Sequence, residues 1–336
     1  MEFPTHADVA GNIPRSDVPA FALIQDQLGQ VKELINEQLT GSARSEQTNR
    51  LLKYVNACSG KMIRPGLVLL SGMCCGGITD EHIRIAAIVE MMHSATLLHD
   101  DVIDEGQKRR GLPTINNLWG NEFAVLLGDF VLSQVFKMCA DLQPKVTNII
   151  AAIAARTCEG EIRQIIERQN WQLSESEYID IISEKSAVFF SNCCRLGAVL
   201  AQATDTHVKS LACFGLNVGI AFQIVDDLLD ITGDESRTGK TAGSDVDKNK
   251  LTLATIHLLR EVDETEKPAV TNELDAAQQR KDVLADMLRS HGSFEYAQNR
   301  AQEFVTKAVR VLANFKESDA KEALIETAKF VADRAI

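Results

Sequence analysis

Two long apolar stretches end in the same acidic pattern, and this repetition constrains the fold more than any other feature of the chain. The first stretch begins near Thr79 and Asp80, continues as IRIAAIVEMMHSATLLHDDVID, and stops at Gly106. The second runs from about Lys209 through LACFGLNVGIAFQIVDDLLDI and stops at Gly233. Thr and Asp suit the start of a helix, and Gly suits its end. Because both stretches are apolar around most of their circumference, they predict two helices buried in a core.

The rest of the chain is predicted to be helical as well, so the expected fold class is all-α. Aromatic residues are 5% of the 336 residues, and Ala, Leu, Ile, Glu, Gln and Arg recur at helical spacing without a useful alternating strand. Three of the seven prolines fall in the first 20 residues, which hold no apolar core segment. We therefore predict a flexible tail over residues 1–20 and one domain over residues 21–336.

Charge and cysteine content disfavour several classes of protein. The 47 acidic residues outnumber the 35 basic ones, and the net charge of −12 disfavours general binding to nucleic acid or anionic lipid. No apolar run approaches the roughly 18–20 residues that span a bilayer. None of the eight cysteines forms a Cys-x-x-Cys pair. These features favour a cytoplasmic protein in a reducing environment, without a transmembrane segment.

Six aspartates make up the two acidic patterns. They are Asp100, Asp101 and Asp104 in the first pattern, and Asp226, Asp227 and Asp230 in the second. Residues four apart share one face of a helix, so the first and last aspartate of each pattern point the same way. Clustered carboxylates near a core repel one another and need a cation, and oxygen ligands favour a hard ion such as Mg²⁺. Because Mg²⁺ commonly completes its shell with phosphate, the two patterns predict a diphosphate held between metal ions.

Two other interpretations of the acidic residues are weaker. A single acidic pattern could be a solvated helix end, but two copies that both follow apolar helix argue against this. Glu90-Met-Met-His93 matches the E-x-x-H pattern of di-iron bundles, which need two such patterns. The sequence contains no second one, so a di-iron site is not expected.

Basic residues follow each acidic pattern in polar segments that contain glycine. The first segment, EGQKRRGLPT, carries Arg109 and Arg110, and the second carries Lys240 and Lys250. We expect these segments to be flexible lids that bring positive charge to an anion, since Arg and Lys both bind phosphate oxygens. Lys108, in contrast, is interpreted as a surface residue.

A third basic group precedes the first apolar helix, at Lys61 and Arg64. Pro65 suits the first position of a helix, so both cations would crowd a positive helix N-terminus, where an anion is favoured. His93 lies two turns before Asp100, on nearly the same helix face. Taken alone, a histidine in that position is more often a core residue than a ligand.

These segments together resemble the trans-polyprenyl diphosphate synthases over nearly the whole chain from about residue 21. The resemblance is carried by SGKMIRP, EMMHSATLLHDDVIDEGQKRRGLPTINNLWGNEFAVLLGDF, EGEIRQ, EKSAVFF, GIAFQIVDDLLDITGD and GKTAGSDVDKNKLTLATI, in that order. It implies the isoprenoid synthase fold, a single-domain bundle of long helices around a central cavity. It also implies repeated, Mg²⁺-dependent, head-to-tail condensation of isopentenyl diphosphate with an allylic diphosphate.

The resemblance implies a role for each candidate site residue. The metal ligands, which are also catalytic, would be Asp100, Asp101, Asp104, Asp226, Asp227 and Asp230. The allylic diphosphate would contact Arg109, Lys185 and Lys240, and the isopentenyl diphosphate would contact Lys61, Arg64, His93 and Arg110. Gln223 would line the reacting centre, and Lys250 matches a further lid lysine of the family. Lys185 and Lys240 count as catalytic because they would stabilise the departing diphosphate.

The implied chemistry is ionisation of the allylic diphosphate, followed by attack of the isopentenyl alkene on the carbocation. No protein nucleophile is needed, and no Ser-His-Asp or Cys-His arrangement suggests one. Thr96 and Ala95 lie four and five residues before Asp100, and both are small. In this family a bulky aromatic there would block the product tunnel near C15–C20, so we expect a longer, octaprenyl-like product. Met92, about one turn deeper, would shape the same tunnel.

Two other functions stay open at this point. A class I terpene cyclase shares the fold, but it usually carries an Asn/Ser/Glu-type second metal motif and needs no second diphosphate site. A non-catalytic subunit of a heteromeric synthase tends to lack the metal motifs, whereas both are present here. The family also implies a homodimer, release of the product to a membrane and, by analogy, a product destined for quinone side chains.

Overall fold

The computed structural model describes residues 18–58, 60–232, 250–275 and 281–333. Its elements follow in the order η1 (Pro19–Ile24), α2 (Gln25–Thr40), α3 (Glu46–Ala57), α4 (Ile63–Cys75), α5 (Asp80–Ile103), β1 (Lys108–Arg109), β2 (Leu112–Pro113), α6 (Ile115–Trp119), α7 (Asn121–Cys139), α8 (Pro144–Ile166), α9 (Glu175–Ile182), η2 (Ser183–Ala187), α10 (Val188–Leu200), α11 (Asp205–Thr232), α14 (Leu253–Glu261), α15 (Lys267–Asp275), α16 (Lys281–Ser290), α17 (Ser293–Val311), η4 (Leu312–Asn314) and α18 (Asp319–Asp333). η1 and η4 are 3₁₀ helices, and η2 is a π-helix.

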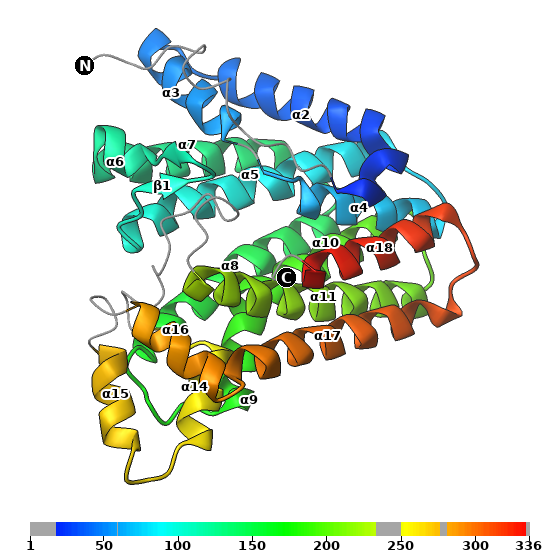
Figure 1. Ribbon diagram of the computed structural model, residues 1–336. Coiled ribbons are helices and arrows are strands. Elements are labelled where there is room, and N and C mark those ends of the chain that lie inside the picture. The colour runs from blue at the N-terminus through cyan, green and yellow to red at the C-terminus, as the bar shows by residue number, and fades with distance from the viewer. Residues whose placement is uncertain (1–17, 59, 233–249, 276–280, 334–336) are drawn as a thin grey trace.

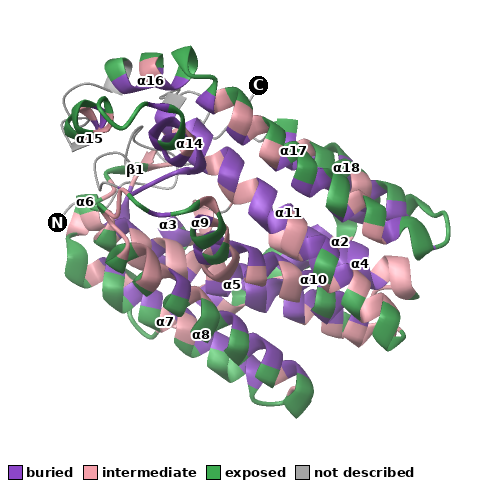
Figure 2. Cartoon of the chain, turned by 90° about the horizontal axis from the view of Figure 1, so that it is seen from below, coloured by how far each residue is buried: buried purple, intermediate pink, exposed green. Residues whose placement is uncertain are grey.

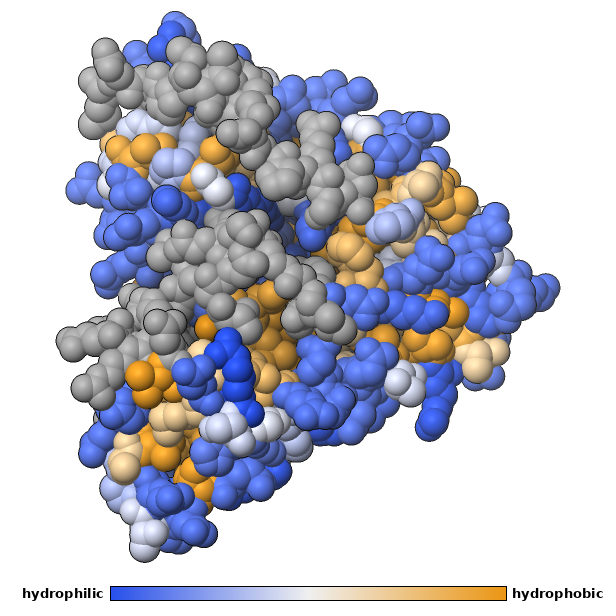
Figure 3. Space-filling model, in the orientation of Figure 1, coloured by the Kyte–Doolittle hydropathy of each residue, from blue (hydrophilic) through white to orange (hydrophobic). Residues whose placement is uncertain are grey.

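The helices pack into a bundle, and the two helices that carry the acidic patterns run through it (Figure 1). α5 packs against α4 and α7, whereas α11 packs against α10 and α17. Figure 2 shows buried positions concentrated along α4, α5, α10 and α11. On the face seen in Figure 3, hydrophilic side chains cover much of the outer surface, and apolar ones show in several separate patches. The predicted all-α fold is confirmed.

The first apolar stretch forms α5, which starts where predicted but ends at Ile103, three residues before the predicted stop at Gly106. Thr79 and His82 form a capping box at its start, with His82 Nδ1 3.1 Å from the Thr79 backbone nitrogen. The helix ends at Ile103, and the backbone N–H of Asp104 still donates to the Asp100 carbonyl at 2.7 Å. The last aspartate of the pattern is therefore the residue at which the chain leaves the helix.

The second stretch forms α11, which begins at Asp205, four residues before the predicted start at Lys209. The hydroxyl of Thr204 accepts a hydrogen bond from the His207 backbone N–H at 3.3 Å and caps the helix there. α5 and α11 begin at the same end of the bundle and run in the same direction (Figure 1). Their acidic C-terminal ends therefore lie at one end of the molecule.

α11 is the one described helix that is long and apolar enough, by length and composition, to cross a membrane. No uninterrupted apolar run in the sequence reaches spanning length, because polar residues such as Asn217 and Gln223 interrupt this stretch, but its mean hydropathy stays high. Half of the most apolar part of α11 is buried inside the bundle. Its packing against α10 and α17 is typical of the core helix of a globular domain.

Two local features differ from the predictions. Val18 and Ala20 are buried, so the expected boundary at residue 21 falls inside η1 and the packed region starts earlier. Residues 1–17, the rest of the expected tail, lie outside the described residues. The segment after α5 contains an antiparallel hairpin of β1 and β2, which the sequence did not predict because each strand has only two residues.

Candidate active site

The two acidic patterns converge on one basic side chain. The guanidinium of Arg109, in the hairpin after α5, interacts electrostatically with Asp101 and Asp100 of the first pattern and with Asp226 of the second. The hairpin lies at the end of the bundle where α5 stops (Figure 1). Arg109 therefore lies within electrostatic range of carboxylates from both patterns, which are far apart in the sequence.

Arg109 and Asp101 form a buried, bidentate ion pair. Arg109 Nη2 donates to Asp101 Oδ1 at 2.7 Å, and Nε donates to Oδ1 and Oδ2 at 2.9 and 3.1 Å. Burial is the largest single influence and would lower the pKa of Arg109, but the carboxylates of Asp101, Asp100 and Asp226 together outweigh it and raise the pKa. The Thr114 hydroxyl donates to the Gly106 carbonyl at 2.6 Å and ties the hairpin to the end of α5. This basic segment thus forms a hairpin that is hydrogen-bonded to the end of α5, and its movement as a lid stays a prediction.

Asp100 carries a charge that its surroundings offset only in part. Burial raises its pKa to about 6, above its ordinary value of 3.8. Lys185 and Arg109 lower the pKa, whereas Glu161 and Asp104 raise it further. A carboxylate in this position is stabilised by an additional cation, so its surroundings suit a metal ion.

Lys185 lies in the π-helical turn η2, between α9 and α10. Its Nζ is 2.6 Å from Glu161 Oε2 and 2.6 Å from Gln164 Oε1, both on α8. Gly160 permits this close approach, because a Cβ there would lie 2.3 Å from the Lys185 backbone nitrogen. Single π-helical turns occur frequently at functional sites. This one brings Lys185 within electrostatic range of Asp100.

Asp104 lies against two basic side chains. Lys250 Nζ donates to its Oδ1 and Oδ2 at 2.9 and 3.2 Å, and the Lys250 side chain is only 3% exposed. Arg168 Nη2 lies 3.9 Å from Asp104 Oδ1. Sequence reasoning missed Arg168, which follows α8 in a turn that belongs to no motif. Lys240, which was predicted to contact the allylic diphosphate, lies outside the described residues.

The second acidic pattern is organised by a chain of three hydrogen bonds. The Tyr178 hydroxyl donates to Asp227 Oδ2 at 2.6 Å, and Gln223 Nε2 donates to Asp227 Oδ1 at 2.7 Å. The Ser186 hydroxyl donates in turn to Gln223 Oε1 at 2.7 Å. Gln223 was predicted to line the centre, but Tyr178 was missed, because nothing in the sequence links residues 49 positions apart.

Among the residues predicted to hold isopentenyl diphosphate, Arg64 and Arg110 lie near a buried carboxylate, Glu90. Burial raises the pKa of Glu90, and the charges of Arg64 and Arg110 lower it. The Arg64 guanidinium lies 5.0 Å from the Phe189 ring centre and 4.8 Å from that of Phe190. The structure therefore brings together two of the arginine and lysine side chains predicted to hold isopentenyl diphosphate.

The other members of this group lie on separate elements. Lys61 precedes α4, and its Nζ lies 5.0 Å from the Phe330 ring centre on α18. His93 lies on α5 and is partly buried. Pro65 is the third residue of α4 and not the first, because the helix begins at Ile63. The first turn still accepts proline, since its N–H groups have no partner within the helix.

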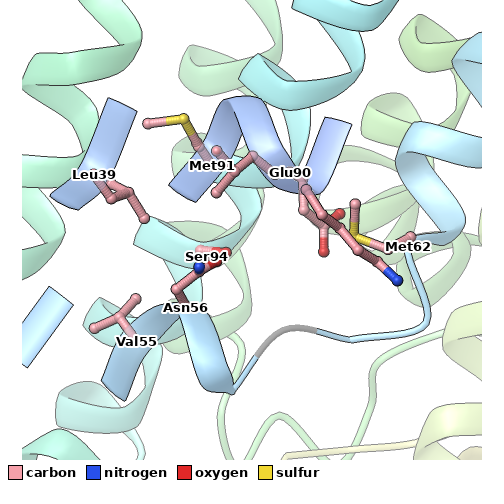
Figure 4. Close-up of a pocket in the computed structure, with 9 residues that line it drawn as sticks. Leu39, Val55, Asn56, Met62, Glu90, Met91 and Ser94 are labelled. Carbon is pink, nitrogen blue, oxygen red and sulfur yellow. The ribbon is translucent and has the colours of Figure 1, made fainter. Parts of the chain in front are cut away.

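A small cavity lies beside Glu90, between α2, α3 and α5 (Figure 4). Figure 4 shows Glu90 beside Met62 at one end and Leu39 beside Val55 at the other. The cavity measures about 20 Å³, which is room for one water molecule. Met91 lines it, but none of the three predicted chain-length residues does.

Two of the predicted chain-length residues lie on the side of α5 that meets α7. Ala95 is fully buried and Met92 is 4% exposed. They precede His99 by four and seven residues and so share its face, and His99 Nε2 lies 3.2 Å from the Val125 carbonyl oxygen of α7. Thr96, the third, is partly buried, and its hydroxyl bonds the backbone of its own helix.

The carboxylates fit Mg²⁺ bound together with a phosphate better than a metal held by protein alone. Within the described ranges, no three His, Cys, Asp or Glu side chains lie close enough together to hold a metal ion. Mg²⁺ usually takes one or two carboxylates and completes its octahedral shell with water and phosphate oxygens. The two patterns also differ internally in burial. Asp101 and Asp227 are buried, whereas Asp100, Asp104, Asp226 and Asp230 are partly exposed.

The chain is similar to proteins of known activity along most of its length. A family model described as polyprenyl synthetase matches residues 45–290. The octaprenyl diphosphate synthase of Escherichia coli (strain K12) is 32% identical over 313 residues, covering 92% of this chain and 96% of the relative. The crystal structure of a polyprenyl synthase from Caulobacter crescentus CB15, complexed with calcium and isoprenyl diphosphate, gives a TM-score of 0.89 at 29% identity, covering 97% and 99% of the two chains. The crystal structure of a decaprenyl diphosphate synthase from Rhodobacter capsulatus gives a TM-score of 0.85 at 32% identity, covering 94% of this chain and 98% of that one.

Similarity alone does not define the product. Relatives of comparable identity carry names that range from geranylgeranyl to decaprenyl diphosphate synthase. The length of the product therefore has to be argued from the residues beside the site.

Proposed function

The chain belongs to the polyprenyl synthetase family and is a prenyltransferase, and from this premise we propose that it builds a linear polyprenyl diphosphate longer than C20. Each step would condense an allylic diphosphate head to tail with isopentenyl diphosphate. The isoprenoid synthase fold expected from the resemblance is confirmed. The observation that carries the proposal is the convergence of both acidic patterns on Arg109, next to a second basic group around Glu90.

We assign Mg²⁺ to the four aspartates that are only partly buried. These are Asp100, Asp104, Asp226 and Asp230. Asp101 and Asp227, counted from the sequence as further ligands, are buried and would instead orient Arg109 and the second pattern through the hydrogen bonds that they accept. The ions supply, when bound, the positive charge that stabilises a departing diphosphate.

The chain's own cations would act on the two substrates separately. Arg109 and Lys185 would bind the allylic diphosphate and stabilise the charge that develops as its carbon–oxygen bond breaks. Arg64 and Arg110 would hold isopentenyl diphosphate so that its alkene faces the carbocation. The proton lost from the new product would pass to the released diphosphate. Further contacts remain predicted for Lys61, His93, Gln223, Lys240 and Lys250.

Replacing Tyr178 by Phe should lower turnover about tenfold. The change removes one of two donors to Asp227, and a hydrogen bond to a charged group contributes roughly 1.5–3 kcal/mol. Steady-state kinetics with isopentenyl and farnesyl diphosphates would measure the effect. Tyr296→Phe is the matched control, since that hydroxyl also donates to a carboxylate, Glu175, but lies away from the acidic patterns. Equal turnover in the two variants would contradict the role given to Tyr178.

Replacing Ala95 by Phe should shorten the product. Ala95 is fully buried on the α7 side of α5, so an added ring would occupy space that the growing chain needs. Overpacking usually costs about 1–3 kcal/mol, so a thermal melt should accompany the product analysis. Ala87→Phe, at another fully buried alanine two turns deeper on α5, is the control for overpacking alone. An unchanged distribution from a folded Ala95→Phe enzyme would remove Ala95 from the tunnel.

The function itself is tested by one incubation with isopentenyl diphosphate, farnesyl diphosphate and Mg²⁺. Chromatography of the extract should find linear diphosphates longer than C20. A cyclic hydrocarbon would support a terpene cyclase instead. Absence of any product from the folded chain would support a non-catalytic subunit of a heteromeric synthase.

The homodimer implied by the family is supported by exposed apolar side chains on consecutive helices. Val125, Leu126 and Phe136 on α7 are 41%, 66% and 70% exposed, and Ile162 and Ile166 on α8 are 59% and 72% exposed. Exposed apolar groups of this size are typical of protein interfaces, and Figure 2 shows both helices carrying exposed positions. Sedimentation analysis should give a dimer, and Phe136→Lys should weaken it.

A cytoplasmic location is proposed on chemical grounds. All eight cysteines are free, as expected in a reducing compartment. The polyprenyl product is itself apolar and would partition from the enzyme into a membrane.

A further inference from the structure

Arg168 lies beside the first acidic pattern without belonging to any recognised motif. It follows the end of α8 at Ile166 and precedes Gln169, which has a positive φ of 60°. Its Nη2 is 3.9 Å from Asp104 Oδ1, and its side chain is 26% exposed. The turn after α8 therefore places a guanidinium at the edge of the candidate active site.

Two of the guanidinium nitrogens are buried without an acceptor. Arg168 Nε and Nη2 have no hydrogen-bond partner within the part of the chain that the structure describes. Arg168 Nη2 and Asp104 Oδ1 form an ion pair, but their separation of 3.9 Å is too long for a hydrogen bond. Buried donors are almost always satisfied in native proteins, so donors left without an acceptor point to a ligand.

The local charge indicates that this ligand is an anion. Asp104 already accepts two hydrogen bonds from Lys250, so Arg168 is a second positive charge beside one carboxylate. An anion with several oxygens, such as a diphosphate, offers the acceptors that Asp104 does not. Asp104 is a proposed Mg²⁺ ligand for the allylic diphosphate. The two arginines proposed to bind isopentenyl diphosphate, Arg64 and Arg110, lie instead near Glu90. The position of Arg168 therefore matches the allylic diphosphate and not the isopentenyl one.

We propose that Arg168 binds the diphosphate of the allylic substrate and is a further substrate-binding residue of this enzyme. This inference rests on the proposed function, because it requires that diphosphate binds at the acidic patterns. Arg168 would hold the leaving group together with Arg109 and Lys185, from a turn that sequence motifs do not mark.

Arg168→Gln tests the proposal. The matched control is Arg163→Gln, which changes an arginine in the last turn of α8, the helix that precedes Arg168. The KM for farnesyl diphosphate should rise about 10- to 100-fold in Arg168→Gln, as expected for loss of a hydrogen bond to a charged group. The KM for isopentenyl diphosphate should stay within about twofold of wild type. Arg168→Lys should recover part of the loss, because it keeps the charge but not the planar donors. Arg163→Gln should change neither KM.

A binding measurement separates this role from a structural ion pair. The chain has two tryptophans, so Trp119→Phe leaves Trp171, three residues after Arg168, as the only one. Titration of that protein with inorganic pyrophosphate and Mg²⁺, followed by Trp171 fluorescence and by calorimetry, gives the dissociation constant. Arg168→Gln should weaken it about 10- to 100-fold.

Two results would overturn the proposal and leave the proposed function intact. One is an unchanged pyrophosphate affinity in Arg168→Gln with only a lower melting temperature, which would make Arg168 a structural partner of Asp104. The other is an equal rise in the KM of both substrates. If Arg109→Gln also left pyrophosphate binding unchanged, the proposed function itself would fail.

Discussion

Asp100→Asn and Asp226→Asn, made separately, are each expected to lower turnover about 10²- to 10³-fold, the range found when one preorganised electrostatic group is removed. Both side chains are partly exposed at the end of the bundle where the two patterns meet. Each would lose a charged metal ligand while keeping its size. Because both act on one leaving group, the double variant should lose less than the product of the two single losses.

The stability of Asp100→Asn distinguishes a functional carboxylate from a structural one. Burial raises the pKa of Asp100 from 3.8 to about 6, so the folded protein disfavours the charged form. For a group of this sign, stability is greatest below the unfolded pKa and is lost as pH rises through the folded pKa. At pH 8 without metal, removing the charge should therefore not lower the melting temperature. Asp141→Asn, at an 85% exposed side chain, is the control for activity. A destabilised Asp100→Asn with full turnover would reverse the assignment.

Arg109→Gln is expected to lower both stability and turnover. Arg109 is the partner of buried Asp101, and removing one member of a buried ion pair typically costs about 3–5 kcal/mol. Its guanidinium is also the group proposed to bind the allylic diphosphate, so turnover should fall about 10²- to 10³-fold. Denaturant unfolding and steady-state kinetics would measure the two losses. Lys108→Gln, on the same strand and exposed, should show neither.

A second change separates these two losses. Asp101→Asn in the Arg109→Gln background removes the uncompensated carboxylate, so much of the stability should return. Turnover should stay low, because no positive charge is restored. Recovery of turnover together with stability would show that Arg109 acts only by holding Asp101, and the diphosphate contact would have to be given up.

The long helices were predictable from the sequence, and so was the choice of most charged residues as candidates for the site. Thr79 marks the start of α5 through local capping chemistry, which a sequence displays directly, whereas the helix ends at Ile103 and not at the predicted Gly106. The two acidic patterns could likewise be found because each lies within five consecutive residues. The start of α11 was placed four residues late, because Thr204 caps it from a position outside the apolar stretch.

The partners of those charges were not predictable, because they depend on contacts between distant segments. Tyr178 and Asp227 are 49 residues apart, and Lys250 and Asp104 are 146 apart. The sequence treats the three aspartates of each pattern alike. The fold distinguishes them by burial. Asp101 is buried and paired with Arg109, whereas Asp100 and Asp104 are partly exposed.

The most direct measurement of the central claim is condensation of farnesyl and isopentenyl diphosphates by the purified enzyme after exhaustive treatment with EDTA. Turnover should fall at least about 10²-fold and return when Mg²⁺ is added in excess, because the acidic patterns bind diphosphate only through divalent ions. Asp100→Asn with Asp226→Asn should gain little from the same addition. Undiminished chain elongation in the metal-depleted enzyme would contradict the account.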